Sequence, residues 1–291
     1  MTNAGNPVDE SVGPADDDKN GVIKSLVRHG FVDGVDLARN VVTGNTDALE
    51  ERARTLDTIC PLSYRYINYY HWTIETLPRI RYARAYEEQT NDEVTYIVWS
   101  DAPAYVDETL ELLGVPERKI ERATSTVYRG SNVIVPSFPE QTTADYRWIR
   151  ETILENADPD TDSIDTGSNV YISRSNAIER QVVNEQEVVD ALSRYDFEPY
   201  VLENQSVAQN VQLFHEADAV VGAHGAGLTD LIYCDDATVF ELFGSKVKDP
   251  YERLADTVGV DYQPIQCQPD STDIVVDIGH LERTLENVLE T

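Results

Sequence analysis

The chain has 291 residues, of which 41% are hydrophobic, enough for about two domains with packed cores. Its 53 acidic residues outnumber 23 basic ones, and the formal net charge of -30 argues against nucleic acids and anionic membranes as partners. The charge predicts a salt-rich cytoplasm, because concentrated salt screens repulsion between like charges. Three cysteines without metal-ligand spacing, and no apolar run typical of a signal peptide or membrane span, favour reduced thiols in a cytoplasmic protein with at most peripheral membrane contact.

Residues 1–20, rich in Asp, Gly, Pro and Asn, predict a mobile leader, and residues 21–160 predict a first α/β domain. The expected elements of this domain are, in chain order, a mixed and partly helical segment over Val22–Pro61, a helix after His71, a strand over Val94–Trp99, a helix carrying Val106, Leu110 and Leu113 that ends at Gly114, an extended run over Val127–Pro136, and a helix carrying Tyr146, Ile149 and Ile153.

The segment Ala157–Gly167, ADPDTDSIDTG, interrupts this alternation with acidic residues, Pro and Gly, and predicts a linker. Its Asp158–Asp162 cluster has two other interpretations, the Asp-x-Asp metal site of one class of sugar transferases and a calcium loop. Ser163 and Asn169 stand where a calcium loop needs Gly and Glu, and no apolar strand leads into the cluster. An exposed acidic linker is the favoured interpretation.

Residues 161–279 predict a second domain, followed by a terminal helix over residues 280–291. Its expected elements are, in chain order, a strand over Asn169–Ser173, a helix with a capping box of Asn184 and Glu187 that ends at Leu192, an extended run over Phe197–Leu202, a helix capped by Ser206 and Gln209, strands over Ala219–Val221 and Thr238–Phe243, a helix starting at Asp249 and Pro250, and a strand over Tyr262–Ile265. This alternation predicts a parallel doubly wound sheet that binds its ligand at the carboxyl ends of the strands.

A glycine-rich turn joins two of these strands in the stretch Val220–Phe243, VVGAHGAGLTDLIYCDDATVFELF. Gly222, Gly225 and Gly227 leave little side-chain bulk before a helix that begins near Leu228, so phosphate oxygens can approach the unpaired N–H groups of that helix. A tight turn without a ligand is the plainer alternative. The incomplete glycine fingerprint and the lack of a G-x-S-x-G elbow argue against a dinucleotide oxidoreductase and a serine hydrolase.

Two arginines follow the first strand of the second domain. Arg174 comes directly after that strand and Arg180 six residues later, so both are expected to face the glycine turn. Forked guanidinium groups match phosphate oxygens and can bind a diphosphate without a metal ion. Ordinary ion pairs with Glu179 or Glu185 are the alternative.

Two further ionisable residues lie in the glycine-turn stretch. His224, inside the turn, can donate a hydrogen bond to a phosphate or a sugar, or it can fix the loop through a backbone hydrogen bond. Glu241 lies near the carboxyl end of the next strand, where a carboxylate can bind a ribose diol.

The first domain offers a candidate acid–base pair within NYYHWTIETLPRI, residues 68–80. His71 and Glu75 are four residues apart and share one helical face, and Pro78 bends or restarts the helix one turn later. A carboxylate beside an imidazole can serve as a general base. The alternative is an amphipathic helix with a Glu75 to Arg79 pair and a satisfied histidine, which spacing alone favours.

These three motifs together, NYYHWTIETLPRI, ISRSNAIERQVVNEQEV and VVGAHGAGLTDLIY followed by VFEL, resemble the signature blocks of glycosyltransferase family 61, and the charge is haloarchaeal-like. The resemblance implies a GT-B fold, with two Rossmann-like domains facing across a cleft. It also implies metal-independent sugar transfer with inversion at the anomeric carbon. By position, Glu75 matches the family's proposed base and His71 its neighbour. The residues that match the donor-site blocks are Arg174, Arg180, His224, Gly225, Ala226, Gly227, Leu228 and Glu241.

The resulting hypothesis is an inverting glycosyltransferase that moves a sugar from a nucleoside diphosphate, with UDP the favoured nucleotide, to a glycan or lipid-linked glycan. No cofactor or metal is expected. Two alternatives stay open, a metal-dependent sugar transferase that uses the Asp158–Asp162 cluster and a non-catalytic nucleotide- or glycan-binding module. A location at the cytoplasmic face of a membrane follows from the resemblance.

Overall fold

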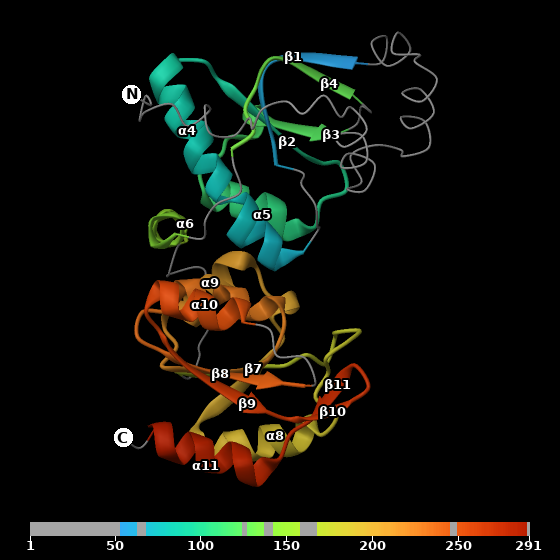
Figure 1. Ribbon diagram of the computed structural model, residues 1–291, viewed down its shortest axis with the longest axis vertical. Helices are drawn as coiled ribbons and strands as arrows, with labels where there is room; N and C mark the ends of the chain where they lie inside the picture. Colours follow the sequence, from blue (N-terminus) through green and yellow to red (C-terminus); the bar gives the residue numbers. More distant parts are fainter. Residues whose placement is uncertain are drawn as a thin grey trace. The chain divides into compact units, whose positions relative to one another are not determined.

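The computed structural model describes residues 53–62, 68–123, 127–136, 142–157, 168–244 and 249–289. The chain divides into two compact units, Met1–Trp148 and Ile149–Thr291, and Figure 1 shows a separate sheet in each. The expected leader and the Asp158–Asp162 cluster lie outside the described residues. The domain limits expected at residues 20, 160 and 279 stay predictions.

The sheet of the first unit has four parallel strands in the order β3-β2-β1-β4. Its strands are β1 (Ala53–Pro61), β2 (Val94–Trp99), β3 (Ile120–Ala123) and β4 (Val127–Val133). The prediction for β2 is confirmed, whereas the partly helical assignment is wrong for residues 53–61. Polar residues in the first half of β1 hide its strand pattern, but strands pair on both of its sides, and Thr58, Ile59 and Cys60 near its carboxyl end are buried.

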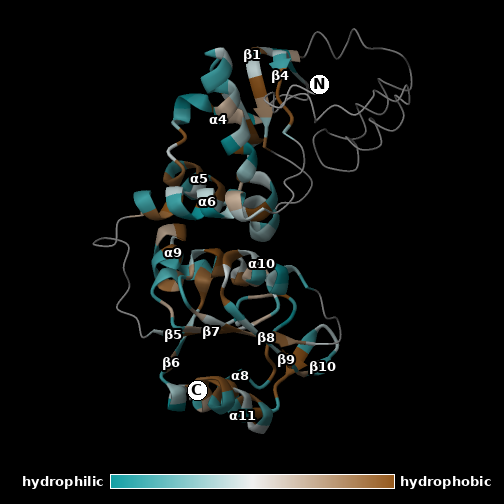
Figure 2. Ribbon diagram, turned by 60° about the vertical axis from the view of Figure 1, so that its left-hand side comes forward, coloured by the Kyte–Doolittle hydropathy of each residue, from teal (hydrophilic) through white to brown (hydrophobic). Residues whose placement is uncertain are grey.

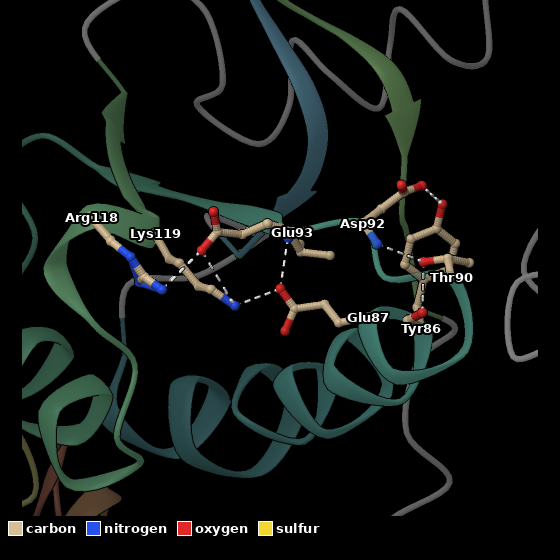
Figure 3. Close-up of polar contacts among 8 residues, drawn as sticks. Tyr86, Glu87, Thr90, Asp92, Glu93, Arg118 and Lys119 are labelled. Atoms are coloured by element: carbon tan, nitrogen blue, oxygen red, sulfur yellow. Dashed lines mark hydrogen bonds and ion pairs between the residues drawn. The ribbon is translucent and has the colours of Figure 1, made fainter.

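Helices lie between these strands and after them. Those between the strands are a π-helical turn (His71–Thr76), α4 (Pro78–Thr90), α5 (Ala104–Leu112) and a short 3-10 turn (Glu117–Lys119), and α6 (Thr143–Asn156) follows β4. Glu87 on α4 accepts hydrogen bonds from the Val94 backbone N–H at 2.7 Å and from Lys119 Nζ at 2.6 Å (Figure 3). This carboxylate therefore ties the end of α4 to the starts of β2 and β3.

The sheet of the second unit has five parallel strands in the order β6-β5-β7-β8-β9. Its strands are β5 (Asn169–Ile172), β6 (Phe197–Tyr200), β7 (Ala219–Ala223), β8 (Thr238–Phe243) and β9 (Asp261–Gln266). The chain passes from β5 to β6 on one side and then returns to place β7 on the other. The strand order therefore reverses between β5 and β7, the position at which open parallel sheets bind ligands.

Helices cover both faces of this sheet, with α9 and α10 on one face and α8 and α11 on the other (Figure 2). They are α8 (Glu185–Leu192), α9 (Val207–His215), α10 (Pro250–Val258) and α11 (Ile278–Leu289), and a 3-10 helix (Ala226–Tyr233) follows β7. The parallel doubly wound arrangement predicted for this half is confirmed. Its inner strands β7 and β8 are mostly hydrophobic because both faces are covered, and β7 is buried at every residue.

The two expected capping boxes have different outcomes. The Ser206–Gln209 box is confirmed, because each side chain bonds the backbone N–H of the other residue. The Asn184–Glu187 box is wrong, because Asn184 makes no side-chain cap and its amide instead pairs with the N–H and C=O of Val276 at 2.9 Å each. A long-range partner has replaced the local one.

A hairpin of β10 (Gln268–Asp270) and β11 (Asp273–Val275) follows β9 and was not predicted. It joins the segment after β5 through a bridge between Val182 and Ile274. All three cysteines are free and buried, as the sequence predicts for reduced thiols. In the part of the chain that the structure describes, no helix has the length and apolar run needed to span a membrane.

Candidate functional site

The side chain of Arg174 lies at the reversal point of the second sheet. Its Nε donates to the carbonyl of Arg180 at 3.0 Å and its Nη2 to the carbonyl of Glu179 at 3.0 Å. No carboxylate of the described residues lies within ion-pair distance of either arginine, so the expected alternative of pairing with Glu179 or Glu185 is wrong for the described chain. Burial, and then the nearby Arg180, lower the pKa of Arg174. Backbone carbonyls thus hold the guanidinium, and it forms no ion pair with a carboxylate of the described chain, although the charge of nearby Glu203 acts against the fall in its pKa.

Gly225 provides the surface against which this guanidinium lies. A Cβ atom added at Gly225 would stand 2.0 Å from Nη1 of Arg174, so only glycine allows this contact. The prediction that Arg174 faces the glycine turn is confirmed. The first backbone bond of the 3-10 helix runs from the Leu228 N–H to the Gly225 carbonyl at 3.0 Å. The N–H groups of Ala226 and Gly227 precede that bond and have no backbone acceptor in the described chain, so they are available beside Arg174.

Glu241 of β8 fixes the His224 side chain, and Tyr262 of β9 in turn fixes Glu241. Its Nδ1 bonds one oxygen of Glu241, and the hydroxyl of Tyr262 donates to the other oxygen at 2.5 Å. Glu241 is completely buried, and the His224 ring stacks on Phe243 with centroids 5.8 Å apart. Both oxygens of the Glu241 carboxylate are therefore occupied. Glu241 is placed to orient the His224 ring, which leaves the Nε2 atom of His224 for a ligand.

A cavity of about 340 Å³ opens beside these residues. Arg180, which has a left-handed backbone with φ of 62°, lines it together with His224. The turn of the β10–β11 hairpin closes another side with Ser271, Thr272 and Asp273. The second unit therefore brings a cationic surface, an imidazole and a polar turn to one place.

The predicted acid–base pair forms in the first unit. His71 Nδ1 lies 2.8 Å from Glu75 Oε2, and the two side chains are 34% and 15% exposed. The pair sits on a π-helical turn, in which the N–H of Leu77 bonds the carbonyl of Trp72 five residues back at 2.9 Å. Pro78 explains the wider turn, since it lacks an N–H and its ring conflicts with the carbonyl four residues earlier in an α-helix.

The alternative of a Glu75 to Arg79 ion pair is also resolved. Arg79 is buried, and its Nε donates to the backbone carbonyl of Glu75 at 3.1 Å. No ion pair forms between the two side chains, so the Glu75 carboxylate points to His71. Arg79 therefore supports the backbone of the turn.

Sequence reasoning found most residues of the second site but missed some. Leu228, expected in the donor loop, is buried in the core, so only its backbone borders the turn. Tyr262 and Asp273 were not foreseen, although the run from Pro269 to Asp273, PDSTD, has the composition of a turn between short strands. Among the described residues, no group of three or more His, Cys, Asp and Glu side chains has an arrangement suited to a metal ion.

In a comparison with known families, the sequence of residues 69–240, more than half of the chain, matches a family model described as Glycosyltransferase 61. The chain belongs to glycosyltransferase family 61. This places it in the glycosyltransferase class of enzymes, as the three motifs predict. The hairpin of residues 268–275 lies outside the matched region.

Several relatives in this family are named EGF domain-specific O-linked N-acetylglucosamine transferase. The Drosophila melanogaster protein is 33% identical over 97 residues, which are 32% of this chain and 18% of the fly protein. The Rattus norvegicus protein is 34% identical over 107 residues, which are 35% of this chain and 20% of the rat protein. The chain thus spans about a fifth of the length of the curated relatives that it matches.

Proposed function

We propose that this member of glycosyltransferase family 61 transfers a sugar from a nucleoside diphosphate, UDP, to a glycan hydroxyl with inversion at the anomeric carbon. One observation carries the donor part of the proposal. The guanidinium of Arg174 is fixed by two backbone carbonyls against Gly225, beside free N–H groups and without a carboxylate partner in the described chain. A diphosphate supplies the negative charge and the acceptors that this surface lacks.

The same residues can also assist the departure of the diphosphate leaving group. When the bond between the anomeric carbon and the diphosphate oxygen breaks, negative charge grows on the leaving group. Arg174 and Arg180, together with the N–H groups of Ala226 and Gly227, can stabilise that charge in the transition state. In this proposal they take the place that a divalent cation has in metal-dependent transferases, so EDTA is expected to leave the rate unchanged.

We assign the base to Glu75 in the first unit. Its carboxylate would accept the proton of the acceptor hydroxyl while the oxygen attacks the anomeric carbon from the side opposite the diphosphate. A single displacement of this kind inverts the configuration. The close approach of His71 Nδ1 to Glu75 Oε2, at 2.8 Å, supports the proposal by placing an imidazole beside the carboxylate. The proposal also includes a GT-B arrangement, in which the two units face each other across the donor and acceptor sites.

The acceptor and the location belong to the proposal as well. We propose a glycan or lipid-linked glycan as acceptor, reached at the cytoplasmic face of the membrane. The names of the relatives, which include N-acetylglucosamine transferase, make N-acetylglucosamine the first sugar to test.

The deciding experiment compares the wild-type protein with Arg174→Ala in concentrated KCl. Calorimetry should detect UDP binding to the wild type and a loss of about a hundredfold or more in the variant, since one charge-stabilising donor contributes about 3 kcal/mol. Arg118→Ala, an exposed arginine of the first unit that pairs with Glu93, is the matched control. UDP binding that is unchanged in Arg174→Ala would remove the donor site from this place.

A further inference from the structure

The cavity beside Arg180 is lined by groups of three chemical kinds. Arg180 and His224 supply a guanidinium and an imidazole, and Ser271, Thr272 and Asp273 supply hydroxyls and a carboxylate. Leu242, Ile274 and Ala223 supply apolar surface. This mixed lining matches a phosphate-linked sugar ring, which has polar edges and less polar faces.

The hairpin that carries the turn is firmly attached to the site. The Ile274 N–H bonds the Gln181 carbonyl at 3.0 Å, and the Val183 N–H bonds the Ile274 carbonyl at 2.8 Å. A Cβ atom at Gly244, the residue after β8, would stand only 2.9 Å from Ile274. The hairpin therefore lies against the carboxyl end of β8 as well as the segment that follows β5.

Asp273 connects the turn to the arginines. Its Oδ1 accepts the N–H of Gln181 at 3.0 Å, directly after the left-handed Arg180, whose carbonyl in turn holds Arg174. The same oxygen also accepts the Thr272 hydroxyl at 3.5 Å, and the second oxygen has no hydrogen-bond partner in the described chain, although the residue lines the cavity. The other carboxylate on the lining, Glu179, is exposed, whereas Asp273 is half-buried and oriented by its bond.

Glu241, the carboxylate that the sequence assigned to a ribose diol, is buried with both oxygens occupied. Asp273 is better placed for that chemistry. We propose that this cavity binds the vicinal hydroxyls of a phosphate-linked sugar ring, and that Asp273 and Thr272 of the hairpin turn are the residues that select it. This inference rests on the proposed function, because it needs the diphosphate at Arg174. The hairpin lies outside residues 69–240, the region that the family model matches.

The test measures binding of inorganic pyrophosphate, UDP and UDP-N-acetylglucosamine by calorimetry in concentrated KCl. Asp273→Asn keeps an oxygen that accepts the Gln181 N–H but removes the charge that strengthens a bond to a hydroxyl. We expect it to weaken binding of UDP-N-acetylglucosamine by about tenfold and to leave the affinity for pyrophosphate within about twofold of the wild type. Thr272→Val should act in the same direction with a smaller loss, about threefold.

Two matched variants control for charge alone. Asp270→Asn removes a carboxylate from the same hairpin at an exposed residue that does not line the cavity, and Glu179→Gln removes one from its exposed rim. Asp270→Asn should leave all three affinities unchanged, Glu179→Gln should not weaken UDP-N-acetylglucosamine relative to pyrophosphate, and thermal unfolding should give equal midpoints for every variant. A loss in Glu179→Gln without one in Asp273→Asn would overturn the assignment of Asp273.

The ligands also separate the two sources of the ring. Equal weakening of UDP and UDP-N-acetylglucosamine by Asp273→Asn, absent with 2′,3′-dideoxy-UDP, identifies the ribose. Weakening that is confined to UDP-N-acetylglucosamine identifies the transferred sugar.

Either result supports the pocket. Unchanged binding of both UDP and UDP-N-acetylglucosamine in Asp273→Asn, or a loss of pyrophosphate binding as large as that of UDP-N-acetylglucosamine, would overturn it while the donor site at Arg174 stands. A wild-type protein that binds none of the three ligands would instead contradict the proposed function, and the pocket with it.

Discussion

The two candidate sites differ in how their residues are brought together. His71 and Glu75 are four residues apart on one turn of the first unit, and each position follows from local helical geometry. In the second unit, Arg174 and Gly225 follow two different strands and Glu241 lies in a third, and Arg174 reaches Gly225, and Glu241 reaches His224, only because those strands lie in register. The first site should therefore tolerate changes elsewhere in the chain, whereas the second should transmit them from one strand to the next.

The largest expected effect tests whether the first site acts alone. Glu75→Gln should lower the rate of sugar transfer by about 10² to 10⁴-fold, because a neutral amide cannot accept the proton of the acceptor. The affinity for UDP and the free energy of unfolding should stay unchanged, as measured by calorimetry and urea unfolding. Glu88→Gln, at an exposed carboxylate of α4, is the control with an unchanged rate. Wild-type activity in Glu75→Gln would exclude Glu75 from the mechanism.

The next effect tests the contact between β5 and β7. Gly225→Ala should weaken UDP binding about tenfold or more, because the added methyl group meets Nη1 of Arg174 and displaces a charge-assisted donor. The backbone of Gly225 is extended, with φ of 172°, so the substitution introduces no backbone strain. In an Arg174→Ala background the same change should have no further effect, which a double-mutant cycle measures. Additive losses would contradict the contact, and Gly279→Ala in α11 is the control.

A smaller effect tests the contact between β8 and β9. Tyr262→Phe removes the donor to a buried oxygen of Glu241 and should lower the free energy of unfolding by about 1–3 kcal/mol. Tyr200→Phe removes a hydroxyl that bonds the exposed Glu198 at 2.8 Å and should change stability little. Urea unfolding at fixed salt and pH compares the two. Equal stabilities for both variants would mean that Glu241 does not depend on Tyr262.

The last expected effect, which is absent at neutral pH, compares the cores of the two units through their thiols. Burial raises the pKa from 9.0 to about 12 for Cys60 in β1 and to about 11 for Cys267 after β9. Above pH 9 the unfolded thiol loses its proton while the folded thiol keeps it, so the unfolded state binds fewer protons and stability falls as the pH rises. Each thiol contributes a slope of about 1.4 kcal/mol per pH unit over its window.

Urea unfolding between pH 8 and 11 measures these slopes. Cys60→Ala and Cys267→Ala should each flatten the decline, since alanine does not titrate, whatever their stability at pH 8. The contribution of Cys267 should end at about pH 11, one unit below that of Cys60. A slope identical to the wild type in Cys60→Ala would show that this thiol is not buried in the folded protein.

The sequence was most informative where local pattern and burial agree. The apolar runs of β2 and β8 predicted strands with the bounds that the structure has, because strands covered on both faces are hydrophobic throughout. The proximity of Arg174 to Gly225 also followed from sequence, since both come after parallel strands. Strand β1 was missed because the polar residues of its first half do not resemble an inner strand. Its place inside the sheet follows only from its pairing with β2 and β4.

Long-range contacts account for the other differences. Asn184 has the composition of a helix cap, but its amide pairs with Val276, 92 residues later. Glu241 was expected to face a ligand, and only the positions of His224 and Tyr262 reveal that both of its oxygens are occupied. No local rule predicts such partners, because they depend on which strands become neighbours.

The π-helical turn at His71–Thr76 has a consequence for protein engineering. A hydrogen bond that spans five residues accommodates one residue more per turn than an α-helix does, so the turn equals a single-residue insertion. Deleting Thr73 would restore a regular winding and rotate the residues before the deletion by about 100° relative to α4. His71 would then stand three residues before Glu75, a spacing that still shares one helical face, so the length of this turn sets the angle at which the imidazole approaches the carboxylate.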